Sequence, residues 1–127
     1  MTQDPYQVVP EQLDPAQERQ WGMIAHLAPL VAMVFSAGTL GFVGSIVIYI
    51  MYKDKGPFVR AHAANSVNVQ IMTAIVLLLS LPLMLLLIGF ITFPLAILVA
   101  FVFHIIGAMK ANGGQWWQPP LTPRFVK

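Results

Sequence analysis

The sequence predicts an all-α membrane protein with four transmembrane helices arranged as two hairpins. The first observation is that two long stretches, Gln20–Tyr52 and Ala61–Met109, contain no Asp, Glu, Lys or Arg. The second is composition: 57% of the 127 residues are hydrophobic and 9% are charged, whereas about a quarter of a soluble domain is charged. A soluble fold needs charge on its outer surface, so lipid is the expected solvent for most of this chain.

Each charge-free stretch must fold back on itself. A single span needs about 20 apolar residues to cross about 30 Å of hydrocarbon, and both stretches are longer than that. Turn composition occurs in the first stretch at Ser36–Gly41 and in the second at Gly89–Thr92. The polar segment Lys53–Pro57 separates the stretches. The sequence therefore predicts two helical hairpins joined by a polar loop.

The first hairpin follows a polar tail, residues 1–14, which is predicted to be disordered because it has little apolar periodicity. Asp14, Pro15 and Gln17 match the start of a capped helix, which places the first helix at about residues 15–36. The second helix is predicted at about 40–53 and is short for a full span. It crosses in a thin, tight hairpin, which we favour, or it enters and returns without crossing.

The second hairpin is longer. Pro57 opens the third helix, predicted at 57–88, and the fourth follows at 93–111, where Asn112-Gly113-Gly114 provides the left-handed stop that helix ends favour. Residues 15–112 thus form the predicted membrane domain. Residues 113–127 cannot be helical because of their prolines. This tail is predicted to lie extended at the membrane interface, or to act as a docking strap for another protein.

Four crossings place every basic residue on one side of the membrane. The two hairpin turns on the opposite side carry no charge. By the positive-inside rule the charged side is cytoplasmic, and both termini lie there too. The predicted location is the bacterial cytoplasmic membrane, with multiple passes, and the basic residues concerned are Arg19, Lys53, Lys55, Arg60, Lys110, Arg124 and Lys127.

Composition argues against several classes of function. The formal net charge is only +2 and the basic residues form separate clusters, so no nucleic-acid partner is expected. The absence of cysteine excludes disulfides and thiolate metal sites. No carboxylate lies within either apolar stretch, which removes the usual chemistry of proton relays and ion-coupled transport. We therefore expect a non-enzymatic protein without catalytic residues, cofactor or metal.

Polar residues nevertheless enter the apolar stretches at a similar depth. On the third helix they share one face near its start, and one histidine on the first helix and one on the fourth lie about as deep. Amides that face hydrocarbon unpaired are costly, so these side chains must point inward. They either hydrogen-bond the helices together or line a wet groove that opens to the cytoplasm. This candidate polar groove comprises His26, His62, Asn65, Asn68, Gln70 and His104.

Small residues recur every four positions and mark faces for close helix packing, within the chain or against a second copy. The predicted packing residues are Ala37, Gly41 and Ser45 on the second helix and Ala96, Ala100 and Ala108 on the fourth. Aromatic residues that prefer the membrane interface are predicted to anchor the charged end: Trp21, Tyr52, Trp116 and Trp117. The expected partners are the lipid bilayer and other membrane proteins or a second copy.

Several motifs resemble those of one family. They are Trp21 with Ala25-His26-Leu27-Ala28; Lys53-Asp54 with Pro57-Phe58-Val59-Arg60; His62, Asn65, Asn68 and Gln70; and Lys110-Ala111-Asn112-Gly113-Gly114 followed by Pro119 or Pro120-Leu121 and by Arg124-Phe125. On these residues the chain resembles, over about residues 17–127, the small bacterial membrane proteins of unknown function grouped with the channel-like component of the chloroplast inner-envelope Tic translocon. The resemblance implies a four-helix membrane fold and, by analogy, a role near protein translocation.

Three functions are compatible with these features. The favoured one is an accessory or scaffold subunit of a cytoplasmic-membrane complex, bound through its small-residue faces and polar groove. The Tic resemblance suggests instead a self-associating channel or a protein-translocation element. A small-molecule transporter is the third, although the lack of membrane carboxylates argues against ion-coupled forms.

Overall fold

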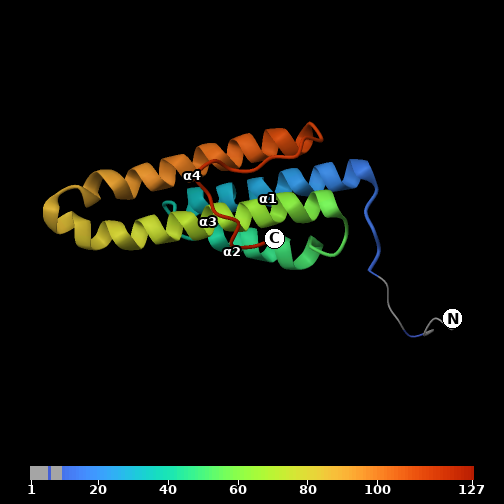
Figure 1. The fold of residues 1–127 in the computed structure, drawn as a ribbon, viewed down its shortest axis with the longest axis horizontal. Helices are drawn as coiled ribbons and strands as arrows, with labels where there is room; N and C mark the ends of the chain where they lie inside the picture. Colours follow the sequence, from blue (N-terminus) through green and yellow to red (C-terminus); the bar gives the residue numbers. More distant parts are fainter. Residues whose placement is uncertain (1–5, 7–9) are drawn as a thin grey trace.

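The computed structural model describes residue 6 and residues 10–127, which form an elongated helical bundle (Figure 1). The described residues contain no strand, so the predicted all-α class is confirmed. The α1–α2 hairpin lies against one part of the longer α3–α4 hairpin (Figure 1). The elements in order are α1 (Pro15–Phe35), α2 (Gly41–Tyr52), α3 (Pro57–Leu83), the 3-10 turn η1 (Met84–Leu86) and α4 (Gly89–Asn112).

Two helical segments are long and apolar enough to cross a membrane. They are α3 together with η1, Pro57–Leu86, and α4, each with a mean hydropathy of 2.4 over its most apolar window. Their outward side chains are large and apolar, and Leu78, Leu85 and Ile91 are among the most exposed. In contrast, α2 has 12 residues, which corresponds to about 18 Å at about 1.5 Å per residue.

The α1–α2 hairpin ends level with the middle of α3. Near the end of α1, the Met33 sulfur accepts a 3.5 Å hydrogen bond from the Gln70 amide, and Gly41 at the start of α2 packs beside the same amide. Beyond Gln70, α3 continues to Leu83, a further rise of about 20 Å. The α3–α4 hairpin therefore projects well past the α1–α2 turn (Figure 1).

Small residues bring α1 and α2 into close contact. A Cβ atom placed on Gly44 would lie 2.8 Å from the main chain of Ala28, so only glycine fits there. Gly41 and Ser45, predicted as packing residues, are buried on α2. Ala37 differs from its prediction: it lies in the turn before α2, exposed and with a φ of 53°. The four-residue spacing of small residues thus extends beyond α2, which begins only at Gly41.

The tip of the α3–α4 hairpin turns earlier than the composition suggested. The chain reverses between η1 and Ile88, with Leu87 at a φ of 67°, and the expected turn residues Gly89–Thr92 form the first turn of α4. Gly89 is needed for close approach, because a Cβ atom there would lie 2.2 Å from the carbonyl oxygen of Ser80. The third helix therefore ends before residue 88, and the fourth begins before residue 93.

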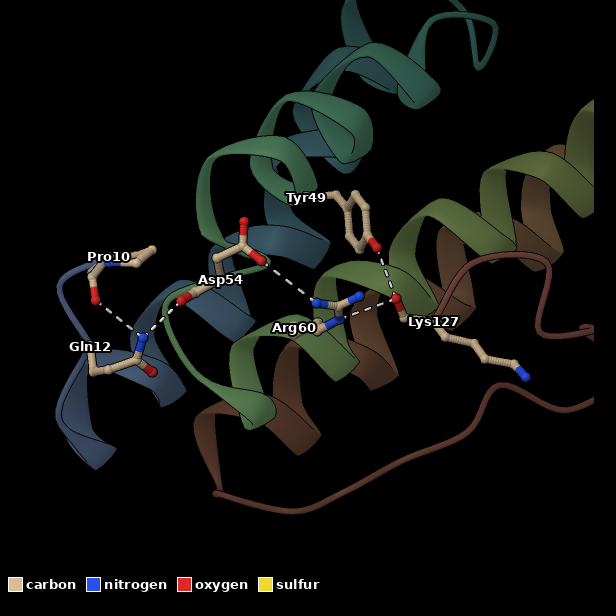
Figure 2. Close-up of polar contacts among 6 residues, drawn as sticks. All are labelled: Pro10, Gln12, Tyr49, Asp54, Arg60 and Lys127. Carbon is tan, nitrogen blue, oxygen red and sulfur yellow. Dashed lines mark hydrogen bonds and ion pairs between the residues drawn. The ribbon is translucent and has the colours of Figure 1, made fainter. Parts of the chain in front are cut away.

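At the other end of the bundle, part of the polar tail is tied to the α2–α3 loop. The predicted capping box is present, because the Asp14 carboxylate accepts from the amide of Gln17 at 2.8 Å and the Gln17 side chain accepts from the amide of Asp14 at 3.1 Å. Figure 2 shows the Gln12 side chain donating to the carbonyl of Asp54 at 2.8 Å. The order thus extends beyond α1 into the tail predicted as disordered, of which residues 1–5 and 7–9 lie outside the described residues.

Glu18 of α1 caps the start of α3. Its carboxylate accepts a 2.9 Å hydrogen bond from the amide of Val59, and a Cβ atom on Gly56 would lie 2.3 Å from the same carboxyl group. Because a negative group at a helix N-terminus satisfies a free amide and opposes the helix dipole, we expect Glu18→Ala to destabilise the fold by about 1 kcal/mol. The measurement is the thermal midpoint in detergent. Glu11→Ala, which removes an exposed carboxylate, is the matched control and should leave the midpoint unchanged.

Candidate functional site: a buried chain of histidines

Three buried histidines meet inside the charged half of the bundle. His26 comes from α1, His62 from α3 and His104 from α4, and each is at most 1% exposed. Small residues near them on the same helices, Ala25, Ala63 and Ala108, are buried as well. The structure thus brings together all three histidines that depth along the sequence suggested could meet.

The side chains form one continuous run of contacts across the bundle. His62 Nε2 lies 2.8 Å from the carbonyl oxygen of Gln115, and His62 Nδ1 lies 3.3 Å from His26 Nε2. On the other side of His26, its Nδ1 lies 3.3 Å from His104 Nδ1. His104 Nε2 is then 2.6 Å from the amide nitrogen of Gln70. We call these four side chains, His62, His26, His104 and Gln70, the histidine chain.

The terminal carbonyl fixes the direction of every hydrogen bond in the histidine chain. A carbonyl oxygen only accepts, so His62 donates from Nε2 and accepts at Nδ1. His26 must then donate from Nε2 and accept at Nδ1. His104 in turn donates from Nδ1 and accepts at Nε2 from the amide nitrogen of Gln70. Each imidazole ring therefore carries a proton on one of its two nitrogens and is neutral. A second proton on any ring would point its N–H group at the N–H group of the neighbouring side chain.

This geometry uses the ring nitrogens for contacts within the protein. The nitrogens of the histidine chain pair one after another and do not converge on a common point. Among the described residues, no group of three or more His, Asp or Glu side chains is arranged to hold a metal ion. The chemistry that the arrangement performs is directional hydrogen bonding between α1, α3 and α4.

Gly107 makes room for the central ring and was not singled out in the sequence. A Cβ atom at this position of α4 would lie 2.3 to 2.6 Å from three atoms of the His26 imidazole. The four-residue spacing pointed to Ala108, which is buried beside it. The available signal was that Gly107 is one turn from His104, so glycine and histidine share a helix face.

A second polar contact joins the two hairpins beside the histidine chain. Ser66 of α3 donates to the carbonyl of Ala25 on α1 at 2.6 Å, and its hydroxyl also lies 2.7 Å from that of Ser45 on α2. Both serines are fully buried. Ser45, predicted only as a small packing residue, therefore also contributes a hydrogen bond.

The rest of the polar face of α3 holds the chain's own tail. We call residues 115–127 the C-terminal strap. The Asn65 side chain donates to the carbonyl of Trp117, and Asn68 both donates to the carbonyl of Val126 at 2.8 Å and accepts from its amide at 2.7 Å. The strap therefore pairs with Asn65 and Asn68, two residues of the candidate polar groove.

The end of the strap is held by side chains of α2 and α3. Figure 2 shows the main-chain oxygen of Lys127 accepting from Tyr49 of α2 at 2.8 Å and from Arg60 of α3 at 3.2 Å. Arg60 also lies 3.7 Å from the carboxylate of Asp54 in an exposed ion pair. The strap thus crosses from α4 over α3 to α2.

The predicted interface aromatics lie in three different settings. Trp21 and Tyr52 stack on each other with ring centroids 4.2 Å apart, at the charged end. Trp117 points inward, 5.9 Å from the His26 ring. Trp116 is 64% exposed and so remains a candidate membrane anchor.

Among the predicted packing residues of α4, Ala100 and Ala108 are buried and Ala96 is partly exposed.

Comparison with known proteins gives one family. The family model of MamF/MmsF, described as the magnetosome magnetite crystal formation protein family, matches residues 17–126. No curated protein matches, and no solved structure matches.

This match corrects the resemblance drawn from the motifs. The assignment to a Tic-like family is wrong, and the channel or translocation role that it suggested loses its support. The motif residues, from Trp21 to Phe125, all lie within the matched residues. Many of them, such as His26, His62 and Asn68, hold the bundle and its strap together, so they describe an architecture rather than a transport activity.

Proposed function

The chain belongs to the MamF/MmsF family, and on this premise we propose that it is a non-enzymatic accessory protein of the magnetosome membrane that takes part in magnetite crystal formation. Membership in this family implies a membrane location. The description of the family supplies the process, and the charge distribution of this chain supports the kind of role.

The observation that carries the proposal is that charged residues lie at one end of the α3–α4 hairpin and exposed leucine side chains lie at the other. α1 begins, α2 ends, α3 begins and α4 ends at the charged end, next to residues such as Lys53, Arg60 and Lys110. The opposite tip exposes Leu85, Leu86 and Leu87. A polar partner is therefore recognised at the charged end, and we propose that the protein acts on crystal formation by organising other membrane components there.

Polar groups inside the bundle support a structural role for its interior. No buried side-chain nitrogen or oxygen among the described residues lacks a hydrogen-bond partner. The histidine chain and the asparagines engage each other and the strap. A fully paired polar core stabilises one arrangement of helices, which suits a scaffold.

We further propose that both hairpins enter the membrane from the cytoplasmic side, and that only α3 and α4 cross completely. The positive-inside rule sets the direction. The α1–α2 turn ends level with Gln70, and its polar groups are paired within the turn: Leu40 donates to the Ser36 hydroxyl at 2.9 Å, and Gly38 donates to the Met33 carbonyl at 2.7 Å. Such pairing lets an irregular segment lie at membrane depth.

Single cysteines test this topology, because the natural chain has none. In sealed vesicles, an impermeant maleimide should label Lys55→Cys from the cytoplasmic side and Leu86→Cys from the other side. Thr39→Cys, in the α1–α2 turn, should resist labelling from both sides. Labelling of Thr39→Cys from the side that labels Leu86→Cys would show four complete crossings instead.

The functional role is tested by deleting the gene in its native host and restoring variants. We expect deletion to change the size or number of magnetite crystals seen by electron microscopy. The double variant Lys53→Glu with Lys55→Glu should fail to restore them and should lose co-purifying membrane proteins in mild detergent. Leu86→Gln, at the opposite tip, is the matched control and should restore both. Crystals unaffected by deletion, or a native chain that always elutes alone, would contradict the proposal.

A further inference from the structure

Two cavities follow one another along α3. The first, about 340 Å³, is bounded by Ala64 and Asn65 of α3 and by the strap residues Trp116, Arg124 and Lys127. The second, about 250 Å³, is an apolar groove between α3 and α4. Their α3 residues continue at helical spacing, from Ala61, Ala64 and Asn65 in the first to Val69, Met72, Thr73 and Val76 in the second.

The strap borders both cavities. Its residues Trp116–Gln118 and Arg124 border the first cavity, while Leu121 and Thr122, which lie between them in the chain, border the groove. The polar cavity is nearer the charged end of the bundle, because its α3 residues come earlier in the helix. A molecule that occupies both would have its polar group at the membrane surface and its apolar part at greater depth.

The first cavity has the chemistry of an anion site. Arg124 and Lys127 are exposed cations among its lining residues, and the described lining includes no Asp or Glu. A guanidinium group donates two parallel hydrogen bonds to a phosphate, and an ammonium group adds a point charge. Trp116 supplies an indole of the kind that lies at the level of lipid headgroups.

The second cavity has the chemistry of an acyl-chain site. Its walls are Val69, Met72 and Val76 on α3 and Ala96, Val99 and Phe103 on α4. Ala96 is one of the small residues predicted for helix packing, and it borders the groove. The side chains around it are those that pack against a hydrocarbon chain.

We propose that the two cavities together bind one anionic phospholipid, with its phosphate at Arg124 and Lys127 and an acyl chain in the α3–α4 groove. The order of the cavities along α3 matches the order of the headgroup and chain of a lipid in the leaflet at the charged end. The strap positions both cations, because Asn68 holds Val126 and because Tyr49 and Arg60 hold the main chain of Lys127.

Native mass spectrometry of the intact chain, released from membranes of defined composition, tests the site. Wild-type protein should retain phosphatidylglycerol in preference to phosphatidylcholine. The double variant Arg124→Gln with Lys127→Gln should lower phosphatidylglycerol retention by about tenfold or more, because both cations that attract the phosphate are removed. Lys53→Gln with Lys55→Gln makes the same change of charge in the α2–α3 loop and should retain the lipid as the wild type does.

Two further arms identify which part of the lipid is recognised. Ala96→Phe should fill the groove and lower retention, whereas Leu98→Phe, on the exposed side of α4, should not. Excess glycerol phosphate should fail to displace the lipid. The thermal midpoint shows that each variant is folded. Equal retention of both lipids, or equal retention by the two charge variants, would overturn the proposal. Displacement by glycerol phosphate together with an unaffected Ala96→Phe variant would also overturn it, by showing a site for soluble anions.

Discussion

Gly107→Ala is expected to destabilise the protein by about 1–3 kcal/mol, the usual cost of adding a methyl group to a packed interior. The new Cβ atom would lie within 2.6 Å of three atoms of the buried His26 ring. The ring must move, and both of its hydrogen bonds lengthen. The loss should appear although alanine is favoured over glycine in a helix by about 1 kcal/mol. The measurement is the free energy of unfolding, or the thermal midpoint, in a fixed detergent.

Gly113→Ala is the matched control for this substitution. Gly113 follows α4 at a φ of −78°, which alanine adopts readily, and its added Cβ atom would have no neighbour closer than 3.4 Å. This variant should be as stable as the wild type or slightly more stable. If the Gly107→Ala variant were as stable as the wild type, the close packing of α4 on His26 would be refuted.

Asn68→Ala is expected to release the end of the C-terminal strap. Asn68 satisfies both main-chain groups of the partly buried Val126, and a hydrogen bond of this kind contributes about 0.5–1.5 kcal/mol net. The strap should then open locally while the helices stay folded. We expect the amide of Val126 to exchange its hydrogen about 10 to 100 times faster, at about 1.4 kcal/mol for each factor of ten.

The control for strap release is Gln118→Ala. Gln118 is exposed and makes one 3.3 Å hydrogen bond to Thr122 within the strap itself. Exchange at Val126 should be unchanged in this variant. Unchanged exchange in Asn68→Ala as well would mean that the strap is held by other contacts.

Features that depend on solvation were predictable from the sequence. Charge-free stretches require lipid around them whatever their neighbours are, which is why the all-α class followed from composition alone. The polar face of α3 was also predictable, because an unpaired amide is costly in any apolar surrounding. His62, Asn65 and Gln70 accordingly lie inside the bundle.

Features that depend on the distance between elements were not predictable. Gly89 was interpreted as a turn residue, yet its role is to let α4 approach the main chain of α3. The role of Gly107 depends on His26, which is far away in sequence, and no residue near Gly107 in the chain indicates that the two lie against each other. The occupant of the polar groove was equally hidden, since no periodicity in the strap pairs Val126 with Asn68.

The direction of the histidine chain is tested most directly by nitrogen-15 NMR of protein labelled at histidine, in lipid or detergent at neutral pH. The hydrogen bonds predict three neutral rings, with the proton on Nε2 in His26 and His62 and on Nδ1 in His104. Coupling between His26 and His62 nitrogens across their hydrogen bond would add direct proof. A proton on Nε2 of His104, or an imidazolium at any of the three positions, would contradict the directional chain that joins the helices and the strap.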